Sequence, residues 1–240
     1  MIQDAAEMQG PETRDILLML LCYGYVLAMI LVSDRLEGVL NISRRSSRKF
    51  LHAMIGNLPF VIPFFGWPLA PALVAAPFIL VTFIASPYSP SPALRDKLRG
   101  LSDLTEEGHS LGLVLYAISY TLLTVLFPTK PYIIAAGVLP MAYGDSAAAL
   151  VGQRFGRRAL VNGKTLEGTL AMFAASLITL GLSLAYFSAL YPFTFSEKII
   201  PALAAAAVVA VAEVLSPKGF DNIAVPLLGA LTFIVSSGGL

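Results

Sequence analysis

Long apolar stretches alternate with short polar ones along almost the whole chain. A helix needs roughly 20 mostly apolar residues to cross a bilayer, and several stretches reach or approach that length. The pattern predicts an all-α, polytopic integral membrane protein with about 7–8 transmembrane helices, forming a single domain over residues 1–240. The expected spans are approximately 16–32, 52–66, 69–85, 111–127, 131–151, 168–189, 198–215 and 223–240.

The second and third expected spans are short and rich in helix-breaking residues. A proline removes a backbone donor from the helical ladder, so we expect these segments to be tilted or re-entrant. The last expected span, which ends in Ser-Ser-Gly-Gly-Leu, is marginal, and seven spans also agree with the pattern. The prolines in or near spans two and three are Pro59, Pro63, Pro68, Pro71 and Pro77.

Lysine and arginine are unevenly distributed among the connections. Thirteen follow spans one, three, five and seven, and three lie on the opposite side. Cytoplasmic loops carry the excess of basic residues, so the N-terminus is expected outside and the large loops in the cytosol. The thirteen are Arg35, Arg44, Arg45, Arg48, Lys49, Arg95, Lys97, Arg99, Arg154, Arg157, Arg158, Lys164 and Lys218, and the three are Arg14, Lys130 and Lys198.

Composition agrees with a membrane protein and argues against other classes. Apolar residues make up 57% of the chain and charged residues 13%, with a mean hydropathy of +0.77, whereas soluble domains are about a quarter charged. The net charge of +1 argues against nucleic acid as a partner. One cysteine and two histidines supply no zinc framework. Residues 1–15 are polar and acidic, so the first apolar stretch is expected to be a span and not a signal peptide.

An ionisable residue, Asp145, falls in the cytosolic third of the fifth expected span. Inserting a charge at such a depth costs roughly 2.5–3.5 kcal/mol, which makes Asp145 a functional candidate. Gly144, Ala148, Gly152 and Gly156 recur every four residues and would form a ridge that permits close helix packing. The ridge alone agrees equally with a structural role and with a functional one. Asp145 beside it, followed by a basic loop, favours a function.

The loop after this helix combines glycine with basic residues. Exposed backbone N–H groups and a lysine suit the binding of phosphates, and Thr165 is expected to cap the next helix with its positive end near the loop. Six residues separate Gly156 from Gly163 and no strand precedes them, so the loop is not a P-loop. The positive-inside rule alone accounts for the arginines but not for the segment 162–168. The loop's basic residues and glycines are Arg154, Arg157, Arg158, Lys164, Gly152, Gly156 and Gly163.

Two further polar clusters lie near the expected cytosolic boundary. Glu213 ends span seven, and Asp221 and Asn222 begin span eight; the two carboxylates could join Asp145 around Mg²⁺, which is often held by one or two carboxylates and nucleotide phosphates. Alternatively, Asp221 or Asn222 only caps a helix. Arg48, Lys49 and His52, where span two begins, agree equally with contacts to anionic headgroups and with a catalytic role.

The motifs occur in a recognisable order. RKFLH, GDSAAALVGQRFG, NGKTLEGT and EVLSPKGFDNIAVPLL, from about Arg48 to about Leu228, resemble the CTP-dependent lipid kinases of the phytol kinase and dolichol kinase (polyprenol kinase) group, which are distantly related to phosphatidate cytidylyltransferases. The resemblance implies transfer of the γ-phosphoryl group of CTP to the hydroxyl of a long-chain isoprenoid alcohol, with Mg²⁺ as cofactor. The chain is shorter than many dolichol kinases, which makes dolichol the less secure acceptor.

The resemblance also implies roles for individual residues. The catalytic set is Asp145, Lys164, Glu167, Asp221 and His52, with His52 or a carboxylate as the group that orients or deprotonates the alcohol. The metal set is Asp145, Glu213 and Asp221. The nucleotide-binding set is Gly144, Gly152, Arg154, Arg157, Arg158, Asn162, Gly163, Lys164, Thr165, Lys218 and Asn222.

Several alternatives remain open from the sequence. A CTP-dependent diacylglycerol kinase or a CDP-lipid-forming cytidylyltransferase would use similar motifs, and intramembrane acidic residues also occur in ion-coupled transporters. The expected location is the cell membrane in a prokaryote, or the endoplasmic reticulum or a plastid membrane in a eukaryote, with the site facing the cytosol. The partners are CTP, a lipid alcohol and the bilayer, and a homodimer is compatible with the sequence.

Overall fold

The structure is a computed structural model that describes residues 10–40, 43–98 and 111–239. All regular elements in these ranges are helical, and the only β-type pairing among them is an isolated bridge between Ala159 and Thr165. The predicted all-α class is confirmed. Arg99 and the second half of the connection 86–110 lie outside the described residues.

The helices follow one another along the chain with short connections. Five short turns of other helical type accompany them: η1 (Leu58–Phe60), η2 (Ile62–Phe64), the π-helix η3 (Pro140–Gly144), η4 (Val161–Gly163) and η5 (Ser196–Lys198). The α-helices are α1 (Thr13–Leu40), α2 (Arg44–Ile55), α3 (Ala70–Ala75), α4 (Pro77–Ala85), α5 (Pro92–Lys97), α7 (Gly112–Leu126), α8 (Pro131–Leu139), α9 (Asp145–Phe155), α10 (Leu166–Ser188), α11 (Ile199–Leu215) and α12 (Asp221–Ser236).

Seven of the eight expected spans are matched by apolar helices. Four are long enough to cross a membrane, and three more are apolar but shorter. This set agrees with a polytopic membrane protein. The long ones are Thr13–Leu36, Pro131–Phe155, Leu166–Ser188 and Ser196–Leu215, and the shorter ones are Ala70–Ala85, Gly112–Leu126 and Asp221–Ser236.

The expected span 52–66 is the exception. Helix α2 begins upstream of it, at Arg44, and ends at Ile55, and the rest of the segment forms the turns η1 and η2. Pro59 and Pro63 each lie in the first turn of one of these short helices, where a missing N–H is tolerated. The expected interruption is confirmed, but the expectation of one helical span is wrong, because the helical residues are the polar ones before it.

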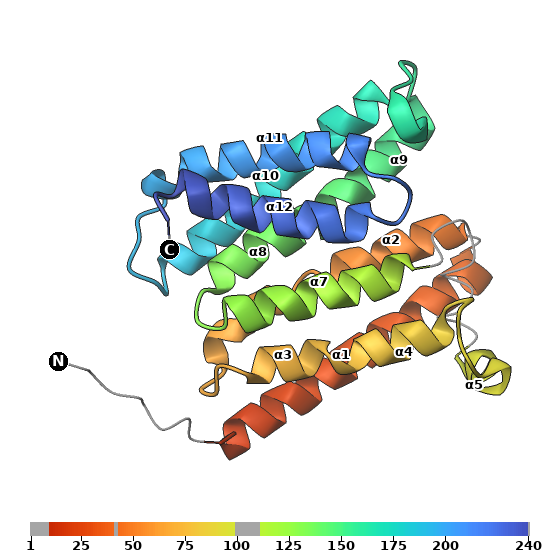
Figure 1. The fold of residues 1–240 in the computed structure, drawn as a ribbon, viewed down its shortest axis with the longest axis horizontal. Coiled ribbons are helices and arrows are strands. Elements are labelled where there is room, and N and C mark those ends of the chain that lie inside the picture. The colour runs from red at the N-terminus through yellow and green to blue at the C-terminus, as the bar shows by residue number, and fades with distance from the viewer. Residues whose placement is uncertain (1–9, 41–42, 99–110, 240) are drawn as a thin grey trace.

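The chain runs back and forth between the two ends of the bundle (Figure 1). The connections α9–α10 and α11–α12 lie at one end, together with α5. The connections α7–α8 and α10–α11 lie at the other end, near the C-terminus. Segments that the sequence predicted on one side of the membrane therefore lie at one end of the molecule.

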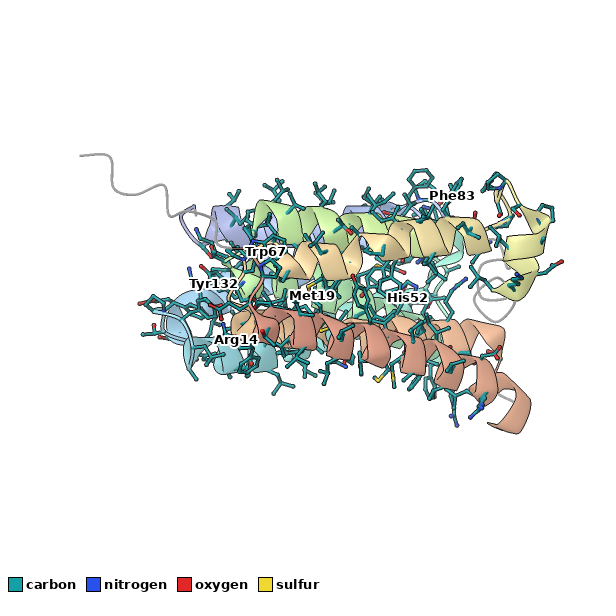
Figure 2. The ribbon with its side chains drawn as sticks, turned by 90° about the horizontal axis from the view of Figure 1, so that it is seen from below. Arg14, Met19, His52, Trp67, Phe83 and Tyr132 are labelled. Atoms are coloured by element: carbon teal, nitrogen blue, oxygen red, sulfur yellow. The ribbon has the colours of Figure 1, made fainter. Side chains whose placement is uncertain are left out.

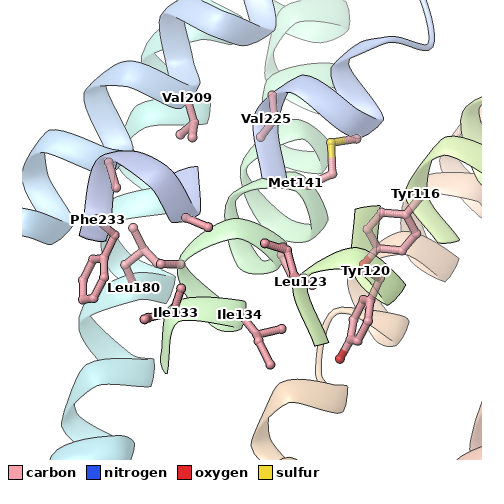
Figure 3. Packing of buried hydrophobic residues seen from close by; sticks show 14 of the residues in the cluster. Tyr116, Tyr120, Leu123, Ile133, Ile134, Met141, Leu180, Val209, Val225 and Phe233 are labelled. Carbon is pink, nitrogen blue, oxygen red and sulfur yellow. The ribbon is translucent and has the colours of Figure 1, made fainter. Parts of the chain in front are cut away.

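The core lies where α7, α8, α10, α11 and α12 meet (Figure 3). Leu123, Ile134, Val209 and Phe233 come from four different helices and are almost fully buried. Small residues bring these helices close together: a Cβ added to Gly229 in α12 would come within 2.7 Å of the carbonyl oxygen of Ala136 in α8. This packing holds the ends of α9, α11 and α12 in fixed relative positions.

Candidate active site

Asp145 follows the π-helix η3, between α8 and α9. Single π-turns within α-helices are frequent at functional sites because they change the direction in which the following side chains point. The Asp145 side chain is buried, with the residue 2% exposed. The preceding Gly144 faces α10, where an added Cβ would collide with Ser176 and Met172. Gly144 therefore permits the close helix packing that the small-residue ridge predicted.

Helix α2 supplies the partner of Asp145. The Lys49 ammonium forms a buried ion pair with the Asp145 carboxylate. The Ser146 hydroxyl donates to the backbone oxygen of Lys49 at 3.1 Å and of Ala142 at 2.6 Å, which fixes α2 against η3 and α9. Arg48, Lys49 and His52 are all buried, so they do not lie along the bundle surface as headgroup-binding residues would.

His52, on α2, is buried, and in Figure 2 it is seen through the gap between α1 and the α3–α4 pair. Its ring stacks on that of Tyr116 in α7, with 4.7 Å between the ring centroids. His52 and Asp145 are also electrostatic neighbours. The imidazole therefore links the surroundings of Asp145 to the buried ring of Tyr116.

Lys164 connects the glycine loop to the two C-terminal helices. Its ammonium pairs with the carboxylate of Glu213 at the end of α11, and lies 3.6 Å from a carboxylate oxygen of Asp221 at the start of α12. Both carboxylates are nearly inaccessible to solvent. The N-cap residue of α12, Phe220, makes no side-chain cap, whereas the Asp221 carboxylate accepts the backbone N–H of Asn222 in the first turn at 3.0 Å, so Asp221 contributes to the helix start as well as pairing with Lys164.

Asn162 explains why the loop reaches α11. Its backbone has φ 57°, in the left-handed region, which asparagine tolerates better than most residues. Its side-chain amide lies 3.0, 3.2 and 3.4 Å from the carbonyl oxygens of Val214, Leu215 and Ser216. These carbonyls belong to the end of α11, where they have no helical partner. Asn162 thus holds the loop next to Glu213.

The start of α10 forms as the sequence predicted. Thr165 is the N-cap residue, and its hydroxyl accepts the backbone N–H of Gly168. Glu167 turns away from the other carboxylates: it accepts the backbone N–H of Arg157 at 3.0 Å and of Arg158 at 3.3 Å. Its contacts order the loop before α10.

These elements enclose a cavity of about 440 Å³. Four basic and three acidic side chains line it, which gives a formal charge of +1. A cavity of this size and charge suits a polyanion such as a nucleotide with its cation. The lining residues are Arg48, Lys49, Asp145, Ala148, Ala149, Gly152, Gln153, Asn162, Gly163, Lys164, Thr165, Gly168, Thr169, Glu213, Lys218 and Asp221.

The protonation state of Lys164 follows from its neighbours. Burial by itself would lower the pKa of this ammonium, but the carboxylates of Glu213, Asp145 and Asp221 outweigh burial and raise the pKa above its ordinary value of 10.5. Lys164 is therefore charged at neutral pH and can stabilise a phosphate, but it cannot accept a proton there.

The carboxylates fit a hard divalent cation only together with a ligand. Within the described ranges, no group of three or more acidic, histidine or cysteine side chains is arranged as a metal site. Instead, Asp145 faces Lys49, and Glu213 and Asp221 face Lys164. Carboxylate oxygens that line an open cavity suit Mg²⁺ when phosphate oxygens complete its coordination.

The cavity unites some of the predicted site residues and leaves others outside its lining. His52 and Glu167 of the catalytic set are not in the lining, and neither are Gly144, Arg154, Arg157, Arg158 and Asn222 of the nucleotide-binding set. Those that line it are Asp145, Lys164, Asp221, Glu213, Gly152, Asn162, Gly163, Thr165 and Lys218.

Some cavity residues were not in the predicted sets. Arg48 and Lys49 belong to the RKFLH motif. Their basic character agreed equally with contacts to lipid headgroups and with a catalytic role, and only their burial in the structure distinguishes the two. Gln153 and Thr169 also line the cavity. Their only signal in the sequence was position, since Gln153 follows Gly152 of the small-residue ridge and Thr169 follows Gly168 in the NGKTLEGT motif.

Comparison with known proteins identifies the family. No family model matches the chain, and no solved structure matches it either. The chain is 36% identical over 222 residues to the phytol kinase of Synechocystis sp., with 86% of each chain covered. Identity at this level over most of both chains indicates common descent and a shared fold. The chain belongs to the phytol kinase family.

Proposed function

We propose that the protein is a CTP-dependent kinase that transfers the γ-phosphoryl group to the hydroxyl of a long-chain isoprenoid alcohol, with phytol as the first candidate. One observation carries the proposal: a basic cavity with three buried carboxylates lies at one end of an apolar helical bundle. The related cyanobacterial protein is a phytol kinase, which supports the acceptor class.

The reaction needs little covalent participation by the protein. A bond forms between the alcohol oxygen and the γ-phosphorus, the bond from that phosphorus to the β–γ bridging oxygen breaks, and CDP leaves with the bond's electron pair. The alcohol proton passes to a base. Catalysis of such a transfer depends mainly on positioning and on neutralising charge. Lys164 and Lys49, with Arg48 and Lys218, would contact the phosphate oxygens.

Asp145 and Asp221, with Glu213 beside them, are the residues that would hold Mg²⁺. The cation would neutralise charge on the triphosphate and fix its geometry. When the nucleotide binds, Lys49 and Lys164 would exchange their carboxylate partners for phosphate oxygens. The lysines thus keep the buried carboxylates paired until the ligand arrives, which avoids the cost of unpaired buried charge.

The alcohol would approach from the membrane side of the cavity. His52 or one of the carboxylates would orient or deprotonate its hydroxyl. We propose that the cavity faces the cytosol, because the alternate connections that carry thirteen of the sixteen basic residues are expected there, and the connections α9–α10 and α11–α12 among them line the cavity.

The test uses the purified full-length protein in detergent with Mg²⁺. CTP labelled at the γ-phosphate is offered together with phytol, farnesol, dolichol or diacylglycerol, and ATP replaces CTP in a parallel series. Labelled phytyl phosphate is the expected product, and Lys164→Ala is the inactive control. Label that enters only from α-labelled CTP would establish a cytidylyltransferase instead. Transfer only to diacylglycerol, or only from ATP, would contradict the acceptor or the donor.

A further inference from the structure

A second cavity lies between α1, α2, the α3–α4 pair and α7. It measures about 50 Å³ and is lined by side chains that are almost all apolar. Its one aliphatic hydroxyl, that of Thr82, donates to the backbone oxygen of Phe78 at 2.6 Å and so is satisfied within α4. Representative lining residues are Val26, Leu51, Val74, Ala75, Phe78 and Tyr116.

Helix α2 contributes to both cavities. Lys49 lines the polar cavity, and Leu51 lines the apolar one. His52, the next residue, stacks on Tyr116, which is itself part of the apolar lining. Helix α2 therefore supplies neighbouring residues to both cavities, and the His52–Tyr116 pair adjoins the apolar lining.

The lining of this cavity suits an apolar group. The atoms that line it lack contacts that close packing would supply, and apolar cavities do not hold water well. Tyr116 and Tyr120, both in this lining, carry buried hydroxyls that have no hydrogen-bond partner among the described residues, so a ligand that brings an apolar chain together with a hydroxyl suits the cavity.

We infer that this cavity binds the first part of the isoprenoid chain, next to the hydroxyl of the acceptor alcohol. The inference rests on the proposed function. It adds that the side chains lining this cavity determine which alcohol is accepted. Since the cavity is far smaller than the polar one, only a short stretch of chain fits. The remainder would run along the exposed leucines of α1 and α4, such as Leu27, Leu31 and Leu80.

Two alanines on α3 provide a matched test. Ala75 lines the cavity and is 7% exposed, whereas Ala72, on the same helix, is 6% exposed and does not line it. The substitutions Ala75→Leu and Ala72→Leu add the same volume at similar burial. Ala75→Leu should raise the KM for phytol roughly tenfold and leave the KM for CTP unchanged, because only this leucine occupies the chain's place. Equal effects of the two variants on the KM for phytol, or no effect of Ala75→Leu, would overturn the inference.

A binding experiment separates this inference from the proposed function. A photoreactive isoprenoid alcohol is cross-linked to the purified protein without nucleotide, and the labelled peptides are identified by mass spectrometry. Adducts on α3, α4 or α7, displaced by phytol and reduced in Ala75→Leu but not in Ala72→Leu, are expected. Such adducts in a protein that transfers no phosphoryl group would uphold the cavity and refute the kinase. Phosphorylation of phytol with adducts only elsewhere would refute the cavity alone.

Discussion

The ammonium of Lys49 and the carboxylate of Asp145, 96 residues apart in the chain, form a buried ion pair at the wall of the polar cavity. The pair joins the RKFLH motif to the GDSAAALVG motif. Two segments that sequence analysis treated separately therefore form one site. The first two predictions concern substitutions in this pair.

Asp145→Asn should lower kcat/KM for phytol phosphorylation by about 10²–10³, the usual effect of removing one preorganised electrostatic contact. The asparagine keeps the shape of the side chain but loses the charge that pairs with Lys49 and that the proposed cation would require. Asp96→Asn, on the exposed surface of α5, is the control and should leave activity unchanged. Membrane insertion of both variants, checked by fractionation, should match the wild type. An Asp145→Asn protein with full activity would refute the site.

A double-mutant cycle on stability tests the pair itself. Lys49→Ala or Asp145→Ala leaves one buried charge without its partner, which costs about 3–5 kcal/mol. The double variant leaves neither charge, so its loss should fall short of the sum of the single losses by about 0.5–3 kcal/mol. Unfolding of the detergent-solubilised protein would measure this. Lys97→Ala, on exposed α5, should be neutral, and strict additivity would contradict a direct interaction.

Much of the fold could be predicted from local patterns, because each apolar helix is specified by its own residues. Thr165 as an N-cap and the close approach at Gly144 were predictable for the same reason. The segment 52–66 was not, since hydropathy alone could not show that Arg44–Ile55 is the helical part. Its polar residues are buried against a distant motif, and a local window does not contain that motif.

The sequence predicted the site residues that belong to recognisable motifs, but not the contacts between those motifs. Asp145, Lys164, Glu213 and Asp221 were expected near one another, and the structure places them around one cavity. The pairing of Lys49 with Asp145 and the contact of Asn162 with the end of α11 depend on tertiary packing. The catalytic and metal-binding duties of these residues stay predictions until they are measured.

Asn162 should act as a positioning residue for the nucleotide. Asn162→Gly keeps the left-handed backbone without strain but removes the amide that contacts the end of α11. The loss of about 1 kcal/mol of hydrogen bonding should raise the KM for CTP about fivefold and leave the KM for phytol unchanged. Asn162→Asp, which places an acceptor against carbonyl oxygens, should be worse than Asn162→Gly. If steady-state kinetics showed Asn162→Gly equal to the wild type, the loop would not depend on this contact.

Lys164 should give stability a dependence on alkaline pH. Its folded pKa lies above the ordinary value of 10.5, so its ion pairs contribute fully below that pH and are lost as the pH rises through the folded pKa. The apparent melting temperature of wild type minus that of Lys164→Met should stay constant from about pH 7 to about pH 10 and shrink only above. A difference that already shrinks near neutral pH would show that burial dominates and that Lys164 can release its proton.

Substitutions of Glu167 distinguish a catalytic role of this carboxylate from a role in ordering the loop of the NGKTLEGT motif. The sequence predicted a catalytic role for Glu167, whereas its carboxylate accepts the backbone N–H groups of Arg157 and Arg158 and the residue does not line the cavity. Glu167→Gln keeps an acceptor oxygen for the loop, so its activity should stay within roughly twofold of the wild type. Glu167→Ala removes the acceptor and should reduce activity further, together with thermal stability. A general acid or base would behave differently, since Glu167→Gln would then lose about a hundredfold or more in kcat. The ratio of the two variants' kcat values therefore shows whether this carboxylate orders the loop or takes part in the reaction.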